Sequence, residues 1–259
     1  RSVLKTHLDN IRNADITHGY HCGYISPIPH LDFNEHLQEN DFRIFIEALS
    51  NDIVNWENIR KIIKNGGVSY ADTDILQAPS VSDVPEINKA KFISGSNLCL
   101  NLTKPERVFP FYNPPCARGE DTFLSTCLSD RTVRKVPCYA FHDGFGAYSQ
   151  LLSGTLPTKL KAIHWNSEKV IRRFHAACVG WIRYKPLLLY ITDKDTYRTH
   201  IDSMRANLKA TIPSVCRYFG TRSFQNILKE LDKYDSLVET HYQGFQDTKR
   251  IWADIIRSL

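Results

Sequence analysis

The sequence has no long apolar run, no strong excess of charge of one sign and no regular cysteine spacing. Its longest apolar run covers residues 187–191, far short of the roughly 20 residues that a membrane-spanning helix needs. The formal net charge is +5, from 33 Lys and Arg against 28 Asp and Glu. This charge is small and dispersed, so nucleic acid is not expected as a partner.

Several protein classes are excluded by composition. The 12 glycines and 12 prolines are too few for a collagen-like or low-complexity chain. A hydrophobic content of 42% excludes a disordered chain and suffices for one large domain or two modest ones. The seven cysteines include no CxxC pair, so free thiols in a reducing cytoplasm are expected rather than a disulfide framework or a zinc cluster. Because the sequence starts at Arg1 and its single methionine is Met204, we expect a partial or excised chain.

The chain divides into two parts of different pattern, at residues 1–160 and 161–259. In the first part, proline and glycine separate short segments that predict a helix over 41–49, strands over 91–94, 97–102 and 133–141, and a helix over 121–128. From residue 167 onward the apolar spacing becomes 3.6 and predicts helices around 170–182, 197–208, 224–238 and 245–255, the first of them interrupted near Pro186. The expected architecture is a mixed α/β unit followed by a helical region.

Three motifs in the first part carry the candidate chemistry. Ser94-Gly95-Ser96-Asn97 forms a turn of small residues, which suits close approach of a hydroxylated ligand but also suits an ordinary turn between strands. Glu120 and Asp121 are adjacent acids where a turn that also carries Arg118 enters a helix. One of these acids could simply cap the helix. A carboxylate fixed there, after the rigid Asn113-Pro114-Pro115 segment, is also suited to act as a general base.

The third motif, His142-Asp143-Gly144, ends the last predicted strand. A histidine beside an aspartate can bind a divalent cation, or the two can form a surface ion pair. Together, the order of the three motifs resembles the acceptor half of inverting glycosyltransferases of GT-A fold, of the family 2 type, over about residues 15–150. The resemblance implies part of a GT-A-like mixed sheet with a helical C-terminal region, and a bacterial-type enzyme that takes a nucleotide-sugar donor and a glycan or lipid-linked acceptor.

The resemblance also implies roles for individual residues. Asp121 would deprotonate the acceptor hydroxyl, with Glu120 orienting the acceptor or the loop. His142 would approach Mn²⁺ or Mg²⁺, or the donor diphosphate, and Arg118 would neutralise phosphate charge. The acceptor cleft would be lined by Ser94, Gly95, Ser96 and Asn97.

The metal-binding Asp-x-Asp motif of that family has no counterpart at the usual spacing. Asp72-Thr73-Asp74 lies only about 20 residues before Ser94, so it is expected to belong to a loop or a helix cap, with a metal-ligand pair as the alternative. The donor half would then lie upstream of Arg1, and a hexosyltransferase of this kind would be inactive as this chain alone unless a partner supplied that half. A non-catalytic carbohydrate-binding or scaffolding module without a donor site is therefore the main alternative function.

A metal-dependent hydrolase built on His142-Asp143 and the histidines His21, His30 and His36 is a third possibility. The aromatic segment 19–30 could line a substrate cleft or could pack as an ordinary loop. The helical region is expected to pack on the catalytic unit or on a second subunit. Its basic residues near Trp181 offer the alternative of peripheral contact with the inner face of the membrane: Arg172, Arg173, Arg183 and Lys185.

Overall fold

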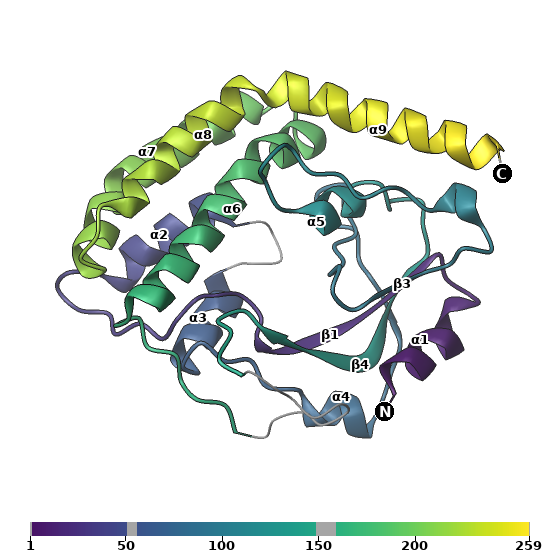
Figure 1. Ribbon diagram of the computed structural model, residues 1–259, viewed down its shortest axis with the longest axis horizontal. Coiled ribbons are helices and arrows are strands. Elements are labelled where there is room, and N and C mark those ends of the chain that lie inside the picture. Colours follow the sequence, from purple (N-terminus) through teal and green to yellow (C-terminus); the bar gives the residue numbers. More distant parts are fainter. Residues whose placement is uncertain (1, 51–55, 149–158, 259) are drawn as a thin grey trace.

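A mixed sheet forms one half of the molecule, and long helices form the other (Figure 1). The computed structural model describes residues 2–50, 56–148 and 159–258, so Arg1 lies outside it. In this part of the chain the sheet has four strands in the order β2-β4-β1-β3. The long strands β1 (Ile16–Tyr24) and β4 (Val133–Asp143) are parallel, whereas β3 (Leu98–Leu100) and β2 (Ser82–Asp83) pair antiparallel with them at the edges. The class is therefore mixed α/β, as the sequence predicts.

Strand β1 is the main element that the sequence does not predict. Seven of its nine residues are buried, so polar and apolar residues do not alternate along it. Its Gly19 is required by close packing, because a Cβ atom there would lie 2.1 Å from Asn97 Nδ2 and 2.7 Å from the Cys138 carbonyl oxygen. Segment 19–30 consists of the second half of β1 and the packed loop that follows it. The glycines and buried polar residues of β1 obscure the alternation by which a strand is recognised in a sequence.

The short elements around the sheet follow the sequence in part. The predicted helix over 41–49 is α2 (Glu39–Leu49), and the stripe Phe42, Phe45, Ile46 and Leu49 is fully buried. The predicted strand over 91–94 is wrong, because Lys91 N and Ile93 N donate hydrogen bonds to Ser125 and not to a neighbouring strand. Ser125 belongs to α5 (Glu120–Ser125), which is shorter than predicted. The other small elements are α1 (Val3–Ile11), α4 (Thr73–Gln77) and a 3₁₀ turn η1 (Pro105–Arg107).

Proline does not interrupt the first long helix. Helix α6 (Glu168–Thr192) continues through Pro186, and α7 (Tyr197–Tyr218) likewise contains Pro213. An internal proline removes one backbone hydrogen bond and costs about 3 kcal/mol, and the buried Ile182, Leu187 and Leu188 on both sides of Pro186 offset that cost. A 3₁₀ turn η2 (Ser223–Gln225) leads into α8 (Asn226–Ser236), and α9 (Val238–Ser258) follows. The predicted helix over 224–238 therefore ends before Val238.

The largest hydrophobic core lies among helices from both parts of the chain. Helices α2 and α3 (Trp56–Lys64) pack with α6, α7 and α8 around Phe42, Phe174 and Phe224. The predicted division at residue 160 stays a prediction, although this core crosses it. Among the described residues, no helix is long and apolar enough to cross a membrane. All seven cysteines are free thiols.

Helix α9 runs from the helical half back over the loop that precedes α5 (Figure 1). Trp252 Nε1 donates a 2.7 Å hydrogen bond to the Val108 carbonyl oxygen, and Tyr112 Oη donates a 2.8 Å bond to the His241 carbonyl oxygen. The rings of Tyr112, Phe123 and Phe245 pack together beneath the helix. The last helix thus fixes the chain that leads to Glu120 and Asp121.

Candidate functional site

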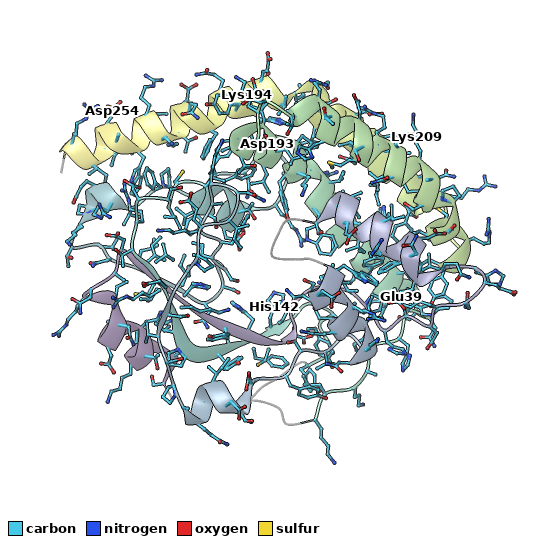
Figure 2. All side chains as sticks on the ribbon, turned by 180° about the vertical axis from the view of Figure 1, so that it is seen from behind. Glu39, His142, Asp193, Lys194, Lys209 and Asp254 are labelled. Atoms are coloured by element: carbon cyan, nitrogen blue, oxygen red, sulfur yellow. The ribbon has the colours of Figure 1, made fainter. Side chains whose placement is uncertain are left out.

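A polar cavity of about 430 Å³ lies where β1 and β4 end. Parallel strands place their carboxyl ends at one edge of a sheet, where α/β proteins commonly bind ligands. Figure 2 labels His142 near the middle of the molecule, between the sheet and the helices. We call this cavity the carboxylate pocket, and its lining consists of His21, Ile25, Ser94, Gly95, Ser96, Glu120, Asp121 and His142. The three motifs identified in the sequence therefore converge.

The turn that carries the two acids is held by the helical half. Tyr234 Oη of α8 donates a hydrogen bond to the Pro115 carbonyl oxygen, and Arg183 Nη1 of α6 donates a 2.8 Å bond to that of Cys116. Arg183 is itself fixed by two bonds to Glu230, of 2.8 and 3.0 Å. Gly119 begins α5 with φ of +112°, and a Cβ atom there would lie 2.9 Å from the Tyr184 ring.

Asp121 faces the Ser94–Asn97 turn across the pocket. Its Oδ2 accepts a 3.1 Å hydrogen bond from Gly95 N, and its Oδ1 accepts a 2.9 Å bond from Thr122 N. Burial is the largest cause that raises the pKa of the Asp121 carboxyl, and the neighbouring charge of Glu120 raises it further. The hydrogen bond from Gly95 N lowers the pKa but does not reverse the shift. Asp121 is thus an accessible carboxylate with increased affinity for a proton.

The environment of Glu120 acts in the opposite direction. Its Oε2 accepts hydrogen bonds from Asn113 Nδ2 at 2.9 Å and from Gly119 N at 3.1 Å. The Asn113 bond is the largest cause that lowers the Glu120 pKa, and the Arg118 charge also lowers it. Two adjacent acids whose pKa values are shifted apart can take different roles, one as a fixed charge and the other as a proton acceptor.

Two imidazoles face the acids across the pocket. His142 Nδ1 donates a 2.9 Å hydrogen bond to the Tyr24 carbonyl oxygen, because that oxygen can only accept, so the neutral ring keeps a lone pair on Nε2. His21 Nε2 lies 2.6 Å from Ser96 Oγ. Burial, with contributions from His142 and Lys135, lowers the pKa of His21 to about 4, so this ring is neutral at pH 7.

Two of the predicted ligand-binding residues do not line the pocket. The Asn97 side chain is buried beneath the turn, where Oδ1 lies 3.0 Å from His7 Nε2 and Nδ2 donates to the carbonyl oxygens of Tyr20 and Cys138 at 2.9 and 3.4 Å. Arg118 is exposed, and its aliphatic part lies against Gly180 of α6. Asn97 therefore anchors the turn, and Arg118 acts on the pocket through its charge on Glu120.

His21 and Ile25 also line the pocket, although the sequence names His21 only as a possible metal ligand and does not single out Ile25. Both lie in the aromatic segment 19–30, whose glycines and histidines were the only signal. That segment divides between the two predicted roles. His21 and Ile25 line the cavity, whereas Cys22 and Tyr24 are buried in packing.

The pocket does not by itself form the expected Mn²⁺ or Mg²⁺ site. These cations prefer several oxygen ligands, but Glu120 Oε2 and both Asp121 oxygens already accept amide hydrogen bonds. In the described part of the chain, no three potential ligand atoms come together around His142. Asp72 caps α4, with Oδ1 accepting a 2.9 Å bond from Asp74 N, as expected for a helix cap. Asp143 Oδ1 and Oδ2 accept 2.8 Å hydrogen bonds from the backbone amides of Ala147 and Tyr148, so this carboxylate supports the loop after β4.

A larger cavity, of about 570 Å³, lies between α2, α6, α7 and the loop around Asn88. Its acids and bases include Asp193 and His200, which pair with each other at 3.0 Å. The candidate site is the smaller cavity because it brings two carboxylates and two imidazoles together. Neither the protein-family models, nor the curated proteins, nor the solved structures with which the chain was compared give a match.

Proposed function

We propose that the carboxylate pocket binds the acceptor in a glycosyl-transfer reaction, with Asp121 as the general base. The observation that carries this proposal is the pair of adjacent acids with pKa values shifted apart, of which Asp121 faces the Gly95 turn. The pocket volume of about 430 Å³ falls in the usual range of about 300–1,000 Å³ for small-molecule sites. Its hydroxyl, amide, carboxylate and imidazole groups suit a ligand with several hydroxyl groups.

In the proposed reaction, one acceptor hydroxyl donates its proton to an Asp121 oxygen. The oxygen lone pair forms the new bond to the anomeric carbon of the donor sugar, and the bond to the nucleoside diphosphate breaks on the opposite face. The configuration at the anomeric carbon is inverted, and the diphosphate carries away the bonding electrons. Ser96 and the neutral His21 would hold other acceptor hydroxyls, while ionised Glu120 keeps its turn in place.

The remaining features of the resemblance stay predictions. They are the GT-A fold, the nucleotide-sugar donor, the glycan or lipid-linked acceptor, a cytoplasmic location with peripheral membrane contact, and association with a second copy. Binding of Mn²⁺ or Mg²⁺ also stays a prediction, and no step of the proposed reaction depends on such an ion.

The test is release of UDP or GDP from nucleotide-sugars by the complete enzyme, donor half included, measured with Mn²⁺ and a panel of oligosaccharide acceptors. Asp121→Asn is expected to reduce turnover by about 10²–10⁴-fold, the usual range for loss of a general base. Asp254→Asn, an exposed acid of α9, is the matched control and should keep full turnover. Because the base must be ionised, wild-type kcat/KM should fall as the pH drops through the raised pKa of Asp121. Turnover of Asp121→Asn close to wild type would remove Asp121 from this role.

A non-catalytic carbohydrate-binding module is the second candidate, because among the described residues no three possible metal ligands come together at the carboxylate pocket. Both candidates predict that the pocket binds acceptor sugars. Calorimetric titration with UDP- and GDP-sugars plus Mn²⁺ separates them, since only the enzyme should bind the donor.

A further inference from the structure

We infer that His30, Asp32 and His164 form a binding site for a divalent transition metal of the zinc class, outside the carboxylate pocket. One ligand atom from each of these side chains lies within 4.8 Å of the other two. In the described part of the chain, this is the only group of three such side chains that approaches so closely. None of the three lines the carboxylate pocket, so the inference does not depend on the proposed function.

The hydrogen bonds of His30 leave a lone pair where a cation is needed. His30 Nδ1 lies 2.8 Å from the Ile63 carbonyl oxygen, which can only accept, so the proton of the neutral ring is on Nδ1. The unprotonated Nε2 then faces another acceptor, Asp32 Oδ1, at 3.1 Å. Two lone pairs at this distance require a positive charge between them, either a second proton or a metal ion. His164 offers a third ligand atom within 4.8 Å of the other two. A metal ion can bind all three ligand atoms at once, whereas a proton bridges only two, so the arrangement favours a metal ion.

The distances agree with a coordination sphere. Bonds of about 2.0–2.2 Å from tetrahedral zinc to nitrogen and oxygen place neighbouring ligand atoms about 3.3 Å apart. The His30–Asp32 separation is close to this value, and rotation of the exposed His164 side chain can bring in the third ligand. Two imidazoles with one carboxylate suit zinc and similar transition metals, whereas Mg²⁺ and Ca²⁺ prefer oxygen ligands. Three protein ligands leave at least one position open to water.

Surrounding residues hold the backbone segments that carry the three ligands. Tyr218 Oη of α7 accepts a 3.0 Å bond from Asp32 N and donates a 3.1 Å bond to the Asp32 carbonyl oxygen. The Trp165 ring, next to His164, packs on Tyr218 with ring centroids 4.7 Å apart. His30 N also donates a 2.7 Å bond to the Ile163 carbonyl oxygen, which aligns the two histidine segments. Such supporting contacts orient ligands in metal sites. A bound ion would tie the loop after β1 to the segment that leads into α6.

The test is zinc stoichiometry, measured by elemental analysis after the chelator-treated protein is dialysed against micromolar Zn²⁺. We expect one ion per wild-type chain, and loss of that ion in both Asp32→Asn and His164→Ala. The control is His36→Ala on the same loop, which removes an exposed histidine outside the cluster and should keep the ion. Both lost ligands are exposed, and circular dichroism checks that the variants are folded.

Two further readouts distinguish this site from zinc bound elsewhere, for example at the exposed Cys116. The cobalt-substituted protein should show visible d–d bands without the near-ultraviolet band of thiolate ligation, and these bands should disappear in His164→Ala. At zinc 100-fold above its Kd, the wild-type Tm should rise by about 5 °C, and that of His164→Ala should not. Equal stoichiometry in the wild type and both ligand variants, or no zinc in the wild type, would overturn the inference.

Discussion

Replacing Asn97 tests whether this residue anchors the pocket turn or contacts a ligand. Its amide joins His7 to the backbone carbonyl oxygens of Tyr20 and Cys138, and the bonds to His7 and Cys138 are buried whereas that to Tyr20 is part-buried. Asn97→Ala removes these three bonds and leaves the two carbonyls and one imidazole nitrogen without them. A hydrogen bond contributes about 1 kcal/mol, and an unsatisfied buried group costs about 1–3 kcal/mol. Since the partners relax in part, we expect a loss of about 3 kcal/mol in the free energy of unfolding.

This loss converts into a measurable shift in Tm. Unfolding entropy is about 2.1 cal/mol/K per residue, or about 0.54 kcal/mol/K for 259 residues. A loss of about 3 kcal/mol should therefore lower the Tm by about 5 °C, and a urea titration should give the same change in free energy. The pocket turn would also lose its support, so binding of acceptor sugars should weaken as a secondary effect.

Two further variants serve as comparisons. Asn101→Ala removes a second buried asparagine, whose Nδ2 donates to the carbonyl oxygens of Ile11 and Ala14 at 3.2 and 2.9 Å, and should be similarly destabilising. Ser96→Ala changes an exposed pocket residue and should alter stability by less than about 0.5 kcal/mol. The reasoning is refuted if Asn97→Ala keeps the wild-type Tm while sugar binding is lost, because Asn97 would then be a ligand-binding residue.

Two other predictions concern stability against pH. The buried His18 has no hydrogen-bond partner for either ring nitrogen among the described residues, and burial, with the nearby Lys135, lowers its pKa to about 4. In the unfolded chain, His18 takes up a proton near pH 6.5, whereas in the folded protein it stays neutral down to about pH 4. The free energy of unfolding is therefore unaffected above pH 6.5 and decreases as the pH falls towards 4, by up to about 3 kcal/mol. His18→Leu should show a smaller drop in urea midpoint between pH 7 and pH 5, and an unchanged drop would contradict the assignment. Asp15 accepts two bonds from Arg107, of 2.6 and 2.7 Å, and one from Thr132 N, of 2.8 Å. Because the Arg107 bonds lower the Asp15 pKa, Asp15→Asn should cost about 2 kcal/mol at pH 7. This difference should shrink as the pH falls through the lowered Asp15 pKa, and a difference that stays constant throughout the acid titration would show that charge is not its source.

The elements with clear periodicity could be predicted from the sequence. The stripe from Phe42 to Leu49 marks α2, and the residues from Val133 to Phe141 mark most of β4. The helices after residue 167 follow the 3.6-residue spacing, but Pro186 suggests a break that the buried packing of α6 overrides. Local propensity predicts where a helix can form, whereas tertiary packing decides whether a proline ends it.

The pocket could be predicted only in part. Ser94, Gly95, Ser96, Glu120, Asp121 and His142 do come together. The direction in which Asn97 points could not be predicted, because a small polar residue in a turn suits a ligand and an anchor equally. Strand β1 was missed because it is buried and contains glycines that close packing requires. The His30–Asp32–His164 group joins segments far apart in the chain, and such contacts leave no trace in local spacing.

The contacts of Tyr234 and Arg183 with the Pro115–Cys116 backbone have a consequence for the order of assembly. During synthesis, the acidic turn leaves the ribosome well before α8. The backbone before Glu120 and Asp121 therefore lacks the hydrogen bond from Tyr234 at first. A nascent chain that stops before Tyr234 should therefore form much of the sheet while its acids remain misaligned. Competence to recognise a ligand would then arise late, when the distal helices dock.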